Sequence, residues 1–254
     1  TTVASVISDD ESHAKSFVVD HRSLALAAAF DPRLMEGIGA ELTAATGMDA
    51  LTHAIEAWIS TISTPTTDRY ALESIQLILE FLPRACEDGS DLEAREAMAI
   101  ASYKAGRAFT QALVGYVHAI SHQVGAHYGT PHGLGNAVIL PKVLAFSKGP
   151  AQSRLARLAV ETGLGEVGDD EAALAQAFID NIVELNKRLG LPDCIAEVRE
   201  EDIPAMAKGA TREALLNYAV PAHMGRRDCE ELLRSLQGEP AVEEDFEVEL
   251  KQAA

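Results

Sequence analysis

The sequence predicts a mainly α-helical protein that begins with a short β-hairpin. Two observations support this fold class. Residues 3–19 alternate in the manner of strands, whereas from Asp31-Pro32 almost to the end apolar residues recur with the period of a helix. Because two strands are marginal in isolation, the core must be helical. We therefore expect a hairpin region over residues 1–31, a helical domain over residues 32–236 and a tail over residues 237–254.

The hairpin is predicted from two apolar segments around a polar turn, with residues 3–7 and 17–19 as strands and residues 8–12 as the turn. The first well-marked helix follows the start signal Thr67-Asp68 and has Pro83 late in its course. Its apolar face has helical spacing and consists of Leu72, Ile75, Leu79 and Leu82.

Two more helices are expected downstream. The segment over residues 91–112 is rich in alanine, with small side chains on one face that permit close helix packing: Met98, Ala101, Ala105 and Ala108. A second apolar stripe covers residues 174–189 and is followed by Gly190 and Pro192, which favour a helix end. The tail holds six acidic residues and one lysine, so we expect a solvated segment.

Composition excludes several classes of protein. The chain has 254 residues, with 21 Lys and Arg against 39 Asp and Glu, for a net charge of −18. A nucleic-acid-binding surface needs stripes of basic residues, so no nucleic-acid partner is expected. No apolar run approaches the roughly 18 residues of a membrane span, so no membrane partner is expected and the prediction is a cytoplasmic protein.

Two pairs with helical i, i+4 spacing carry the candidate chemistry. Asp49 and His53 form one pair, and His118 and His122 form the other. Such spacing places both side chains of a pair on one face of a helix. Taken alone, the first pair is more often a surface pair or a cap, and any single histidine is more often a core residue bonded to a carbonyl.

A further histidine follows ten residues after His122. Thr130 is a plausible N-cap and Pro131 suits the first helical position, so His132 is expected in the first turn of a new helix, brought back toward His118 by a turn at Gly129. Imidazoles buried without partners on apolar helices cost free energy, which a shared metal ion offsets. One carboxylate with three imidazoles suits Fe²⁺ or Zn²⁺ better than Ca²⁺ or Mg²⁺, and the spacing does not choose between iron and zinc.

Three other motif classes are excluded. The sequence has no HExxH of a zinc protease and no Glu-x-x-His of a ferritin-like di-iron bundle. Residues 163–168 match GxGxxG formally, yet a helical pattern precedes them and Asp169-Asp170 follow, which would repel a pyrophosphate. This segment is therefore interpreted as a loop between helices.

Three segments resemble the iron-containing alcohol dehydrogenase family: TAATGMDALTHAIEA over residues 43–57, GYVHAISH over residues 115–122, and PHGLGNAVILP over residues 131–141. The resemblance covers about residues 1–236. It implies the all-helical C-terminal domain of the fold that this family shares with dehydroquinate synthase. It also implies four metal ligands, which map to Asp49, His53, His118 and His132.

The resemblance implies roles for other residues too. His122 matches a histidine near the reacting centre, and Phe109 matches a residue that lines the substrate channel. Thr2 and Lys15 match positions that approach the cofactor, which in the family is held by an N-terminal α/β domain. The hairpin is then interpreted as the last piece of that domain, which this chain otherwise lacks.

The function implied is an oxidoreductase that transfers a hydride between a small alcohol or aldehyde and NAD or NADP, with Fe²⁺ or Zn²⁺ bound and as a homo-oligomer. His122 would relay the proton, since a histidine pKa near neutrality suits that role. Two alternatives stay open. The chain is a metal-binding helical fragment without dehydrogenase activity of its own, or a structural bundle whose histidines are core residues.

Overall fold

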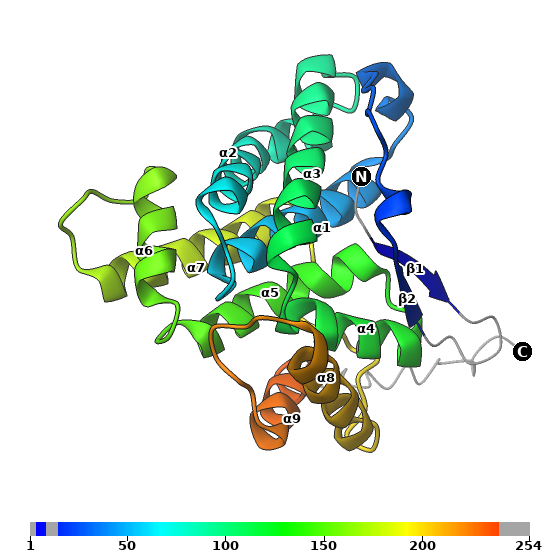
Figure 1. Cartoon of the computed structure of the whole chain (residues 1–254), viewed down its shortest axis with the longest axis vertical. Helices are drawn as coiled ribbons and strands as arrows, with labels where there is room; N and C mark the ends of the chain where they lie inside the picture. Colours follow the sequence, from blue (N-terminus) through cyan, green and yellow to red (C-terminus); the bar gives the residue numbers. More distant parts are fainter. Residues whose placement is uncertain (1–3, 9–14, 239–254) are drawn as a thin grey trace, which may run out of the picture.

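The computed structural model describes residues 4–8 and 15–238 and confirms the predicted fold class, a helical domain preceded by a hairpin (Figure 1). Thr2 and most of the acidic tail lie outside the described residues. The strands and α-helices are β1 Ala4–Ser8, β2 Lys15–Val19, α1 Ala40–Ile59, α2 Pro65–Glu87, α3 Leu92–Ala112, α4 Tyr116–Tyr128, α5 His132–Ser147, α6 Gln152–Glu161, α7 Glu171–Arg188, α8 Ile203–Asn217 and α9 Arg226–Arg234.

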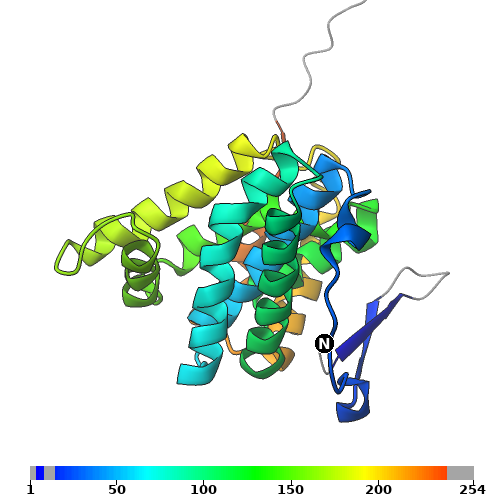
Figure 2. The ribbon, with the colours of Figure 1, turned by 90° about the horizontal axis from the view of Figure 1, so that it is seen from above.

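The hairpin is antiparallel, and its register pairs Ala4 with Val19 and Ser8 with Lys15. Most of the predicted turn lies outside the described residues. Figure 2 shows β1 and β2 standing apart from the body of helices. The hydrophobic core is therefore built by the helices, as expected for a sheet of only two strands.

Helix α1 lies at the centre of the fold and packs against α2, α3 and α5 (Figure 1). Its side chains Met48, Leu51, Ile55 and Trp58 are fully buried. On α3 the alanines of the predicted small-residue face are buried too, which permits close approach of α3 to its neighbours. Helix α4 packs against α5 and α8, α6 against α7, and α8 against α9. Among the described helices, none combines the length and apolar character of a transmembrane span.

Two of the predicted helix starts are wrong, each by a small number of residues. Helix α2 begins at Pro65 rather than behind Thr67-Asp68, because Thr64 is the N-cap: its hydroxyl accepts from the amide of Thr67, and the Thr67 hydroxyl accepts from the amide of Thr64. Helix α5 begins at His132 with Pro131 as its N-cap residue, so Thr130 is not the cap. Pro131 has a non-helical backbone, with φ of −54° and ψ of 130°, and its carbonyl accepts from the amide of Gly135.

Other predicted boundaries are confirmed. The carboxylate of Asp91 accepts from the amide of Ala94 at the start of α3. Helix α4 ends at Gly129, whose φ of 69° is left-handed, and Gly190 closes α7 with the same φ. The GxGxxG match lies in the loop between α6 and α7. A strand does not precede it, so it is not a dinucleotide-binding turn.

The contact between α1 and α5 depends on a glycine next to His132. A Cβ atom at Gly133 would collide with the backbone carbonyl of Ala45. Because a backbone group cannot move aside as a side chain can, we expect Gly133→Ala to lower the free energy of unfolding by about 1–3 kcal/mol. Urea denaturation measures this difference.

Gly149→Ala is the matched control, since no heavy atom lies within 4 Å of a Cβ built there. The control should have the stability of the unchanged protein. Equal stability of both variants would contradict the close approach of α1 and α5 at Gly133.

Candidate metal centre

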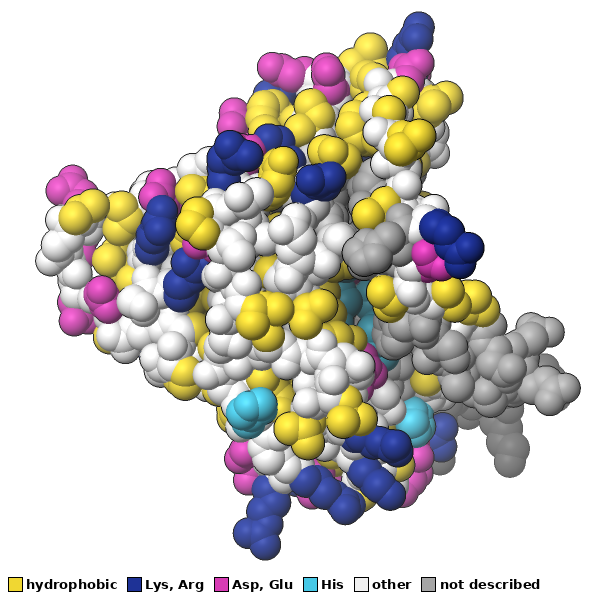
Figure 3. Space-filling model, in the orientation of Figure 1, with side chains coloured by type: hydrophobic (Ala, Val, Ile, Leu, Met, Phe, Trp, Pro, Cys, Tyr) yellow, Lys and Arg dark blue, Asp and Glu magenta, His cyan; other side chains and the backbone are white. Residues whose placement is uncertain are grey.

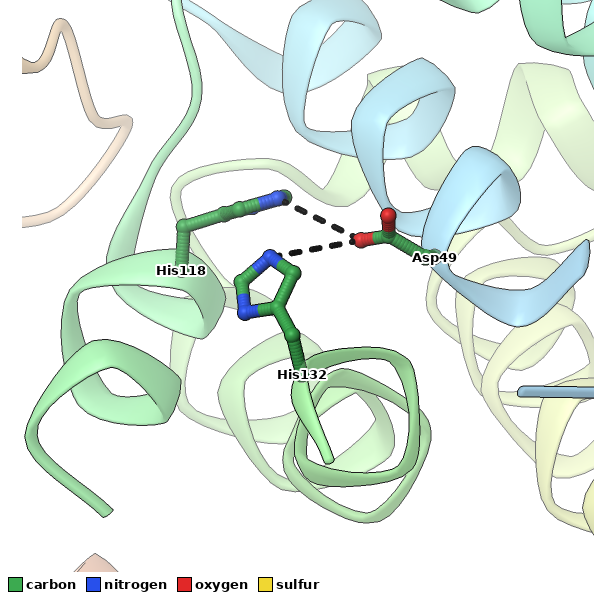
Figure 4. Close-up of side chains that lie close together, drawn as sticks. All are labelled: Asp49, His118 and His132. Atoms are coloured by element: carbon green, nitrogen blue, oxygen red, sulfur yellow. Dashed lines mark ion pairs between the residues drawn. The ribbon is translucent and has the colours of Figure 1, made fainter. Parts of the chain in front are cut away.

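Three helices bring potential metal ligands together. Asp49 comes from α1, His118 from α4 and His132 from the first turn of α5 (Figure 4). The Asp49 Oδ1 atom lies 3.7 Å from His118 Nε2 and 3.5 Å from His132 Nε2. All three atoms lie within 4.8 Å of one another. Side chains separated by up to 83 residues in the sequence thus point toward a common centre.

His53 lies beside this group on the same face of α1 as Asp49. Its Nε2 atom is 3.0 Å from His118 Nε2, and its Nδ1 atom is 3.8 Å from Asp49 Oδ1. The imidazole stacks on the ring of Phe109 from α3, with the ring centroids 4.3 Å apart. The four residues predicted as ligands are therefore neighbours in the structure.

Asn136 reaches the same centre from α5, one turn after His132. Its Nδ2 atom lies 2.6 Å from Asp49 Oδ1, 3.3 Å from His118 Nε2 and 3.2 Å from His132 Nε2. Its Oδ1 atom is buried and has no hydrogen-bond partner among the described residues. Asn136 was not predicted as a site residue, although its i, i+4 spacing from His132 places both side chains on the same face of α5.

Glu56 is a second residue that the sequence analysis did not single out. Its carboxylate is buried, with Oε2 2.6 Å from His118 Nδ1, and Oε1 accepts from the amide of Val117 at 2.8 Å. Glu56 follows Asp49 and His53 at i+7 and i+3, so all three occupy one face of α1. This spacing is the sequence signal for its place near the site.

The charges of the cluster are strongly coupled. Burial opposes a charge on His118, yet the carboxylates of Glu56 and Asp49 outweigh burial and raise the pKa of His118 to about 9. Burial lowers the pKa of His53 to about 4. Burial also opposes ionisation of Asp49, but the adjacent His53 and His118 hold the pKa of that carboxyl well below its usual range. The site therefore favours a positive charge between its carboxylates.

These donors fit a divalent transition-metal ion. Atoms bound tetrahedrally to one ion at about 2.1 Å lie about 3.4 Å from one another. The distances from Asp49 Oδ1 to the two Nε2 atoms, 3.7 and 3.5 Å, are close to that spacing. One carboxylate and imidazole nitrogens form a donor set typical of iron or zinc. A divalent cation would also satisfy the preference of the carboxylates for positive charge.

His122 lies on α4 one turn from His118 and has a carboxylate partner of its own. Its Nδ1 atom is 2.7 Å from Glu213 Oε1, and the hydroxyl of Tyr218 donates to the same oxygen at 2.6 Å. The rings of His122 and His132 are stacked with centroids 5.3 Å apart. Burial and the adjacent Glu213 raise the pKa of Tyr218, so its proton stays on the hydroxyl. Glu213 is 91 residues from His122 in the sequence, and no local sequence pattern predicts their contact.

A cavity of about 600 Å³ opens beside Asp49 and His53. Phe109 lines it together with mostly apolar side chains of α1, α3 and the segment before α1, among them Phe30, Ile38 and Met98. Figure 3 shows histidine side chains at the bottom of a hollow on this face. The cluster is thus reachable from outside through an apolar entrance.

Other predicted residues lie elsewhere. Thr2 is outside the described residues, and Lys15 is the first residue of β2, paired with Ser8, so their approach to a cofactor remains a sequence prediction.

His127 is exposed near the end of α4, and its Nδ1 atom lies 2.9 Å from the carbonyl oxygen of Gln123. A substitution of His127 can therefore serve as a control for substitutions within the cluster.

Comparison with known proteins gives consistent matches. Residues 43–237 match the family model described as "Fe-containing alcohol dehydrogenase family, C-terminal". An NAD-dependent methanol dehydrogenase of Bacillus methanolicus is 45% identical over 212 residues, which cover 83% of this chain and 56% of that protein. A 1,3-propanediol dehydrogenase of Klebsiella pneumoniae is 42% identical over 210 residues, 82% of this chain and 54% of that protein.

Solved structures agree with the sequence matches. A 1,3-propanediol oxidoreductase superposes with a TM-score of 0.88 at 39% identity, over 92% of this chain and 62% of the other. An iron-containing alcohol dehydrogenase from Thermococcus thioreducens gives a TM-score of 0.82 at 30% identity, over 94% of this chain and 61% of the other. The chain spans about half the length of the curated relatives it matches.

Proposed function

The chain belongs to the Fe-containing alcohol dehydrogenase family, and from this premise we propose that it supplies the metal-binding half of an enzyme that oxidises a small alcohol, or reduces the aldehyde, with NAD or NADP. The observation that carries the proposal is the convergence of Asp49, His118 and His132 from three helices. The relatives named above support the reaction class, since their names describe dehydrogenases of methanol and 1,3-propanediol.

Asp49, His53, His118 and His132 are proposed to hold Fe²⁺ or Zn²⁺. A bound divalent ion supplies Lewis-acid chemistry, which polarises the oxygen of the alcohol or aldehyde. The protein side chains fix where that oxygen binds. Asp49 and His53 line the cavity, so a substrate that enters it meets the site from the α1 side. The apolar side chains around Phe109 suit a short aliphatic substrate.

His122 is proposed to move the proton. With its Nδ1–H donated to Glu213, the second ring nitrogen, Nε2, is the one that can accept a proton. Glu213 also accepts from Tyr218, so two donors hold the carboxylate that orients the imidazole. A histidine held in this way can take the hydroxyl proton of an alcohol or return it to a carbonyl oxygen. Thr2 and Lys15 are proposed to contact NAD or NADP.

The ligand assignment predicts which histidines the metal needs. His118→Ala and His132→Ala should each lose most of the bound iron or zinc, because each removes a donor from the group that faces Asp49. His127→Ala should keep the metal content of the unchanged protein, because its side chain is exposed and bonded to Gln123. Metal analysis after reconstitution and desalting measures all three. Equal metal content in the three variants would show that the assignment is wrong.

The role of His122 predicts a separation of binding from turnover. In an active enzyme His122→Ala should keep its metal and lower kcat for alcohol oxidation by about 100-fold or more, the usual contribution of a general acid or base. Steady-state kinetics and metal analysis of the same preparation measure both. Unchanged turnover would remove His122 from the mechanism.

The activity itself is tested on two proteins loaded with Fe²⁺ or Zn²⁺: this chain, and a version extended at its N-terminus to the length of the relatives. Each is assayed with short primary alcohols and NAD⁺ or NADP⁺. The proposal predicts turnover by the extended protein and loss of turnover in its Asp49→Ala variant. An extended protein that binds metal and NAD(P)H yet oxidises no alcohol would contradict the proposal.

The assay also distinguishes the two alternative interpretations, a metal-binding fragment without activity and a structural bundle. A metal-binding module without independent activity predicts that the chain of 254 residues binds the ion but neither binds NAD(P)H nor oxidises an alcohol, while the extended protein does both. A purely structural bundle predicts that neither protein retains iron or zinc.

A further inference from the structure

We infer that Glu56 is a positioning residue of the metal centre, which fixes His118 so that its Nε2 atom faces the ion. The inference rests on the metal site of the proposed function. Glu56 is outside the four ligands: its carboxylate contacts the far side of the His118 imidazole, at Nδ1. Its action on the ion is therefore indirect, through His118.

The Glu56 carboxylate is buried together with its histidine partner. The Glu56 side chain is 2% exposed and that of His118 is 4% exposed. A buried carboxylate is expensive unless hydrogen-bond donors surround it. Glu56 has two, His118 Nδ1 at 2.6 Å and the amide of Val117 at 2.8 Å, one for each oxygen. Both donors belong to the first turn of α4.

Helix α4 has no side-chain cap of its own. Its N-cap residue is Gly115, which offers no side-chain hydrogen bond to the free amides of the first turn. The carboxylate of Glu56, supplied by α1, bonds one of those amides and places a negative charge at the positive end of the helix. A Cβ atom at Gly115 would lie 2.8 Å from Glu56 Oε1, so a glycine there leaves room for the carboxylate.

The contact with Glu56 also decides which ring nitrogen of His118 faces the site. With Nδ1–H donated to Glu56, Nε2 is the ring nitrogen of His118 that faces Asp49 and His53 and is left to bind an ion. Carboxylate partners of this kind orient a ligating histidine and raise its basicity as a ligand. The larger packing partners of helix α4 are α5 and α8. Glu56 is thus a side-chain link between the helix that carries Asp49 and the helix that carries His118.

The test is a titration of the metal-free chain with Co²⁺. Glu56→Gln keeps the size of the side chain and removes its charge, and its NH₂ group cannot accept from Nδ1–H or from the Val117 amide. We expect the affinity for Co²⁺ to fall roughly 10–100-fold and the d–d absorption bands of the bound ion to change. A merely structural role would leave those bands unchanged in the folded fraction.

Glu41→Gln is the matched control, since Glu41 is an exposed residue of the first turn of α1. It should bind Co²⁺ with the affinity and spectrum of the unchanged chain. Glu56→Gln with unchanged affinity and spectrum would overturn the inference. If Glu56→Gln does not fold, Gly115→Ala displaces the carboxylate while retaining its charge, and unchanged Co²⁺ affinity in that variant would overturn the inference as well.

His118→Ala in the same titration distinguishes a wrong role for Glu56 from a wrong assignment of the metal site in the proposed function. If His118→Ala loses Co²⁺ and Glu56→Gln does not, the metal site is correct and the role of Glu56 is wrong. If His118→Ala binds Co²⁺ as tightly as the unchanged chain, the metal site itself is misassigned.

Discussion

His118 lies between two carboxylates of one helix, and the arrangement of the site depends on this interaction. Asp49 faces its Nε2 atom and Glu56 holds its Nδ1 atom, while both carboxylates project from the same face of α1. Charges inside a helical core must be balanced locally, because burial penalises each of them. Glu56 accepts from two donors in the first turn of α4, and a centre that suits a cation remains between Asp49 and His118.

Close helix packing makes this electrostatic arrangement possible. Helices α1, α4 and α5 meet where side chains are smallest: Gly133 lies against the backbone of α1, and Gly115 lies against the Glu56 carboxylate. A Cβ atom at Gly133 would collide with the Ala45 carbonyl, and one at Gly115 would crowd the Glu56 carboxylate. The apolar cavity beside Asp49 and His53 lies on the remaining open side, where α1 and α3 face the segment before α1.

Much of the fold and of the candidate site follows from the sequence, because helical periodicity and i, i+4 spacing are local properties. They predict the helices over residues 91–112 and 174–189, the two i, i+4 pairs Asp49 with His53 and His118 with His122, and the first-turn position of His132. The set of four ligands came from the family resemblance, and neither α8 nor α9 was predicted. The contact between Glu213 and His122 could not be predicted from the sequence, because only the fold brings α8 next to α4. The starts of α2 and α5 were misplaced because Thr64 and Pro131, rather than the residues expected, serve as N-caps.

The central claim is that one ion binds between α1, α4 and α5. Crystals of the chain reconstituted with Fe²⁺, measured on both sides of the iron absorption edge, test it most directly through an anomalous difference map. The account predicts a single strong peak within bonding distance of Asp49 Oδ1 and of the Nε2 atoms of His53, His118 and His132. A peak at any other group of residues, with this cluster empty, would contradict it.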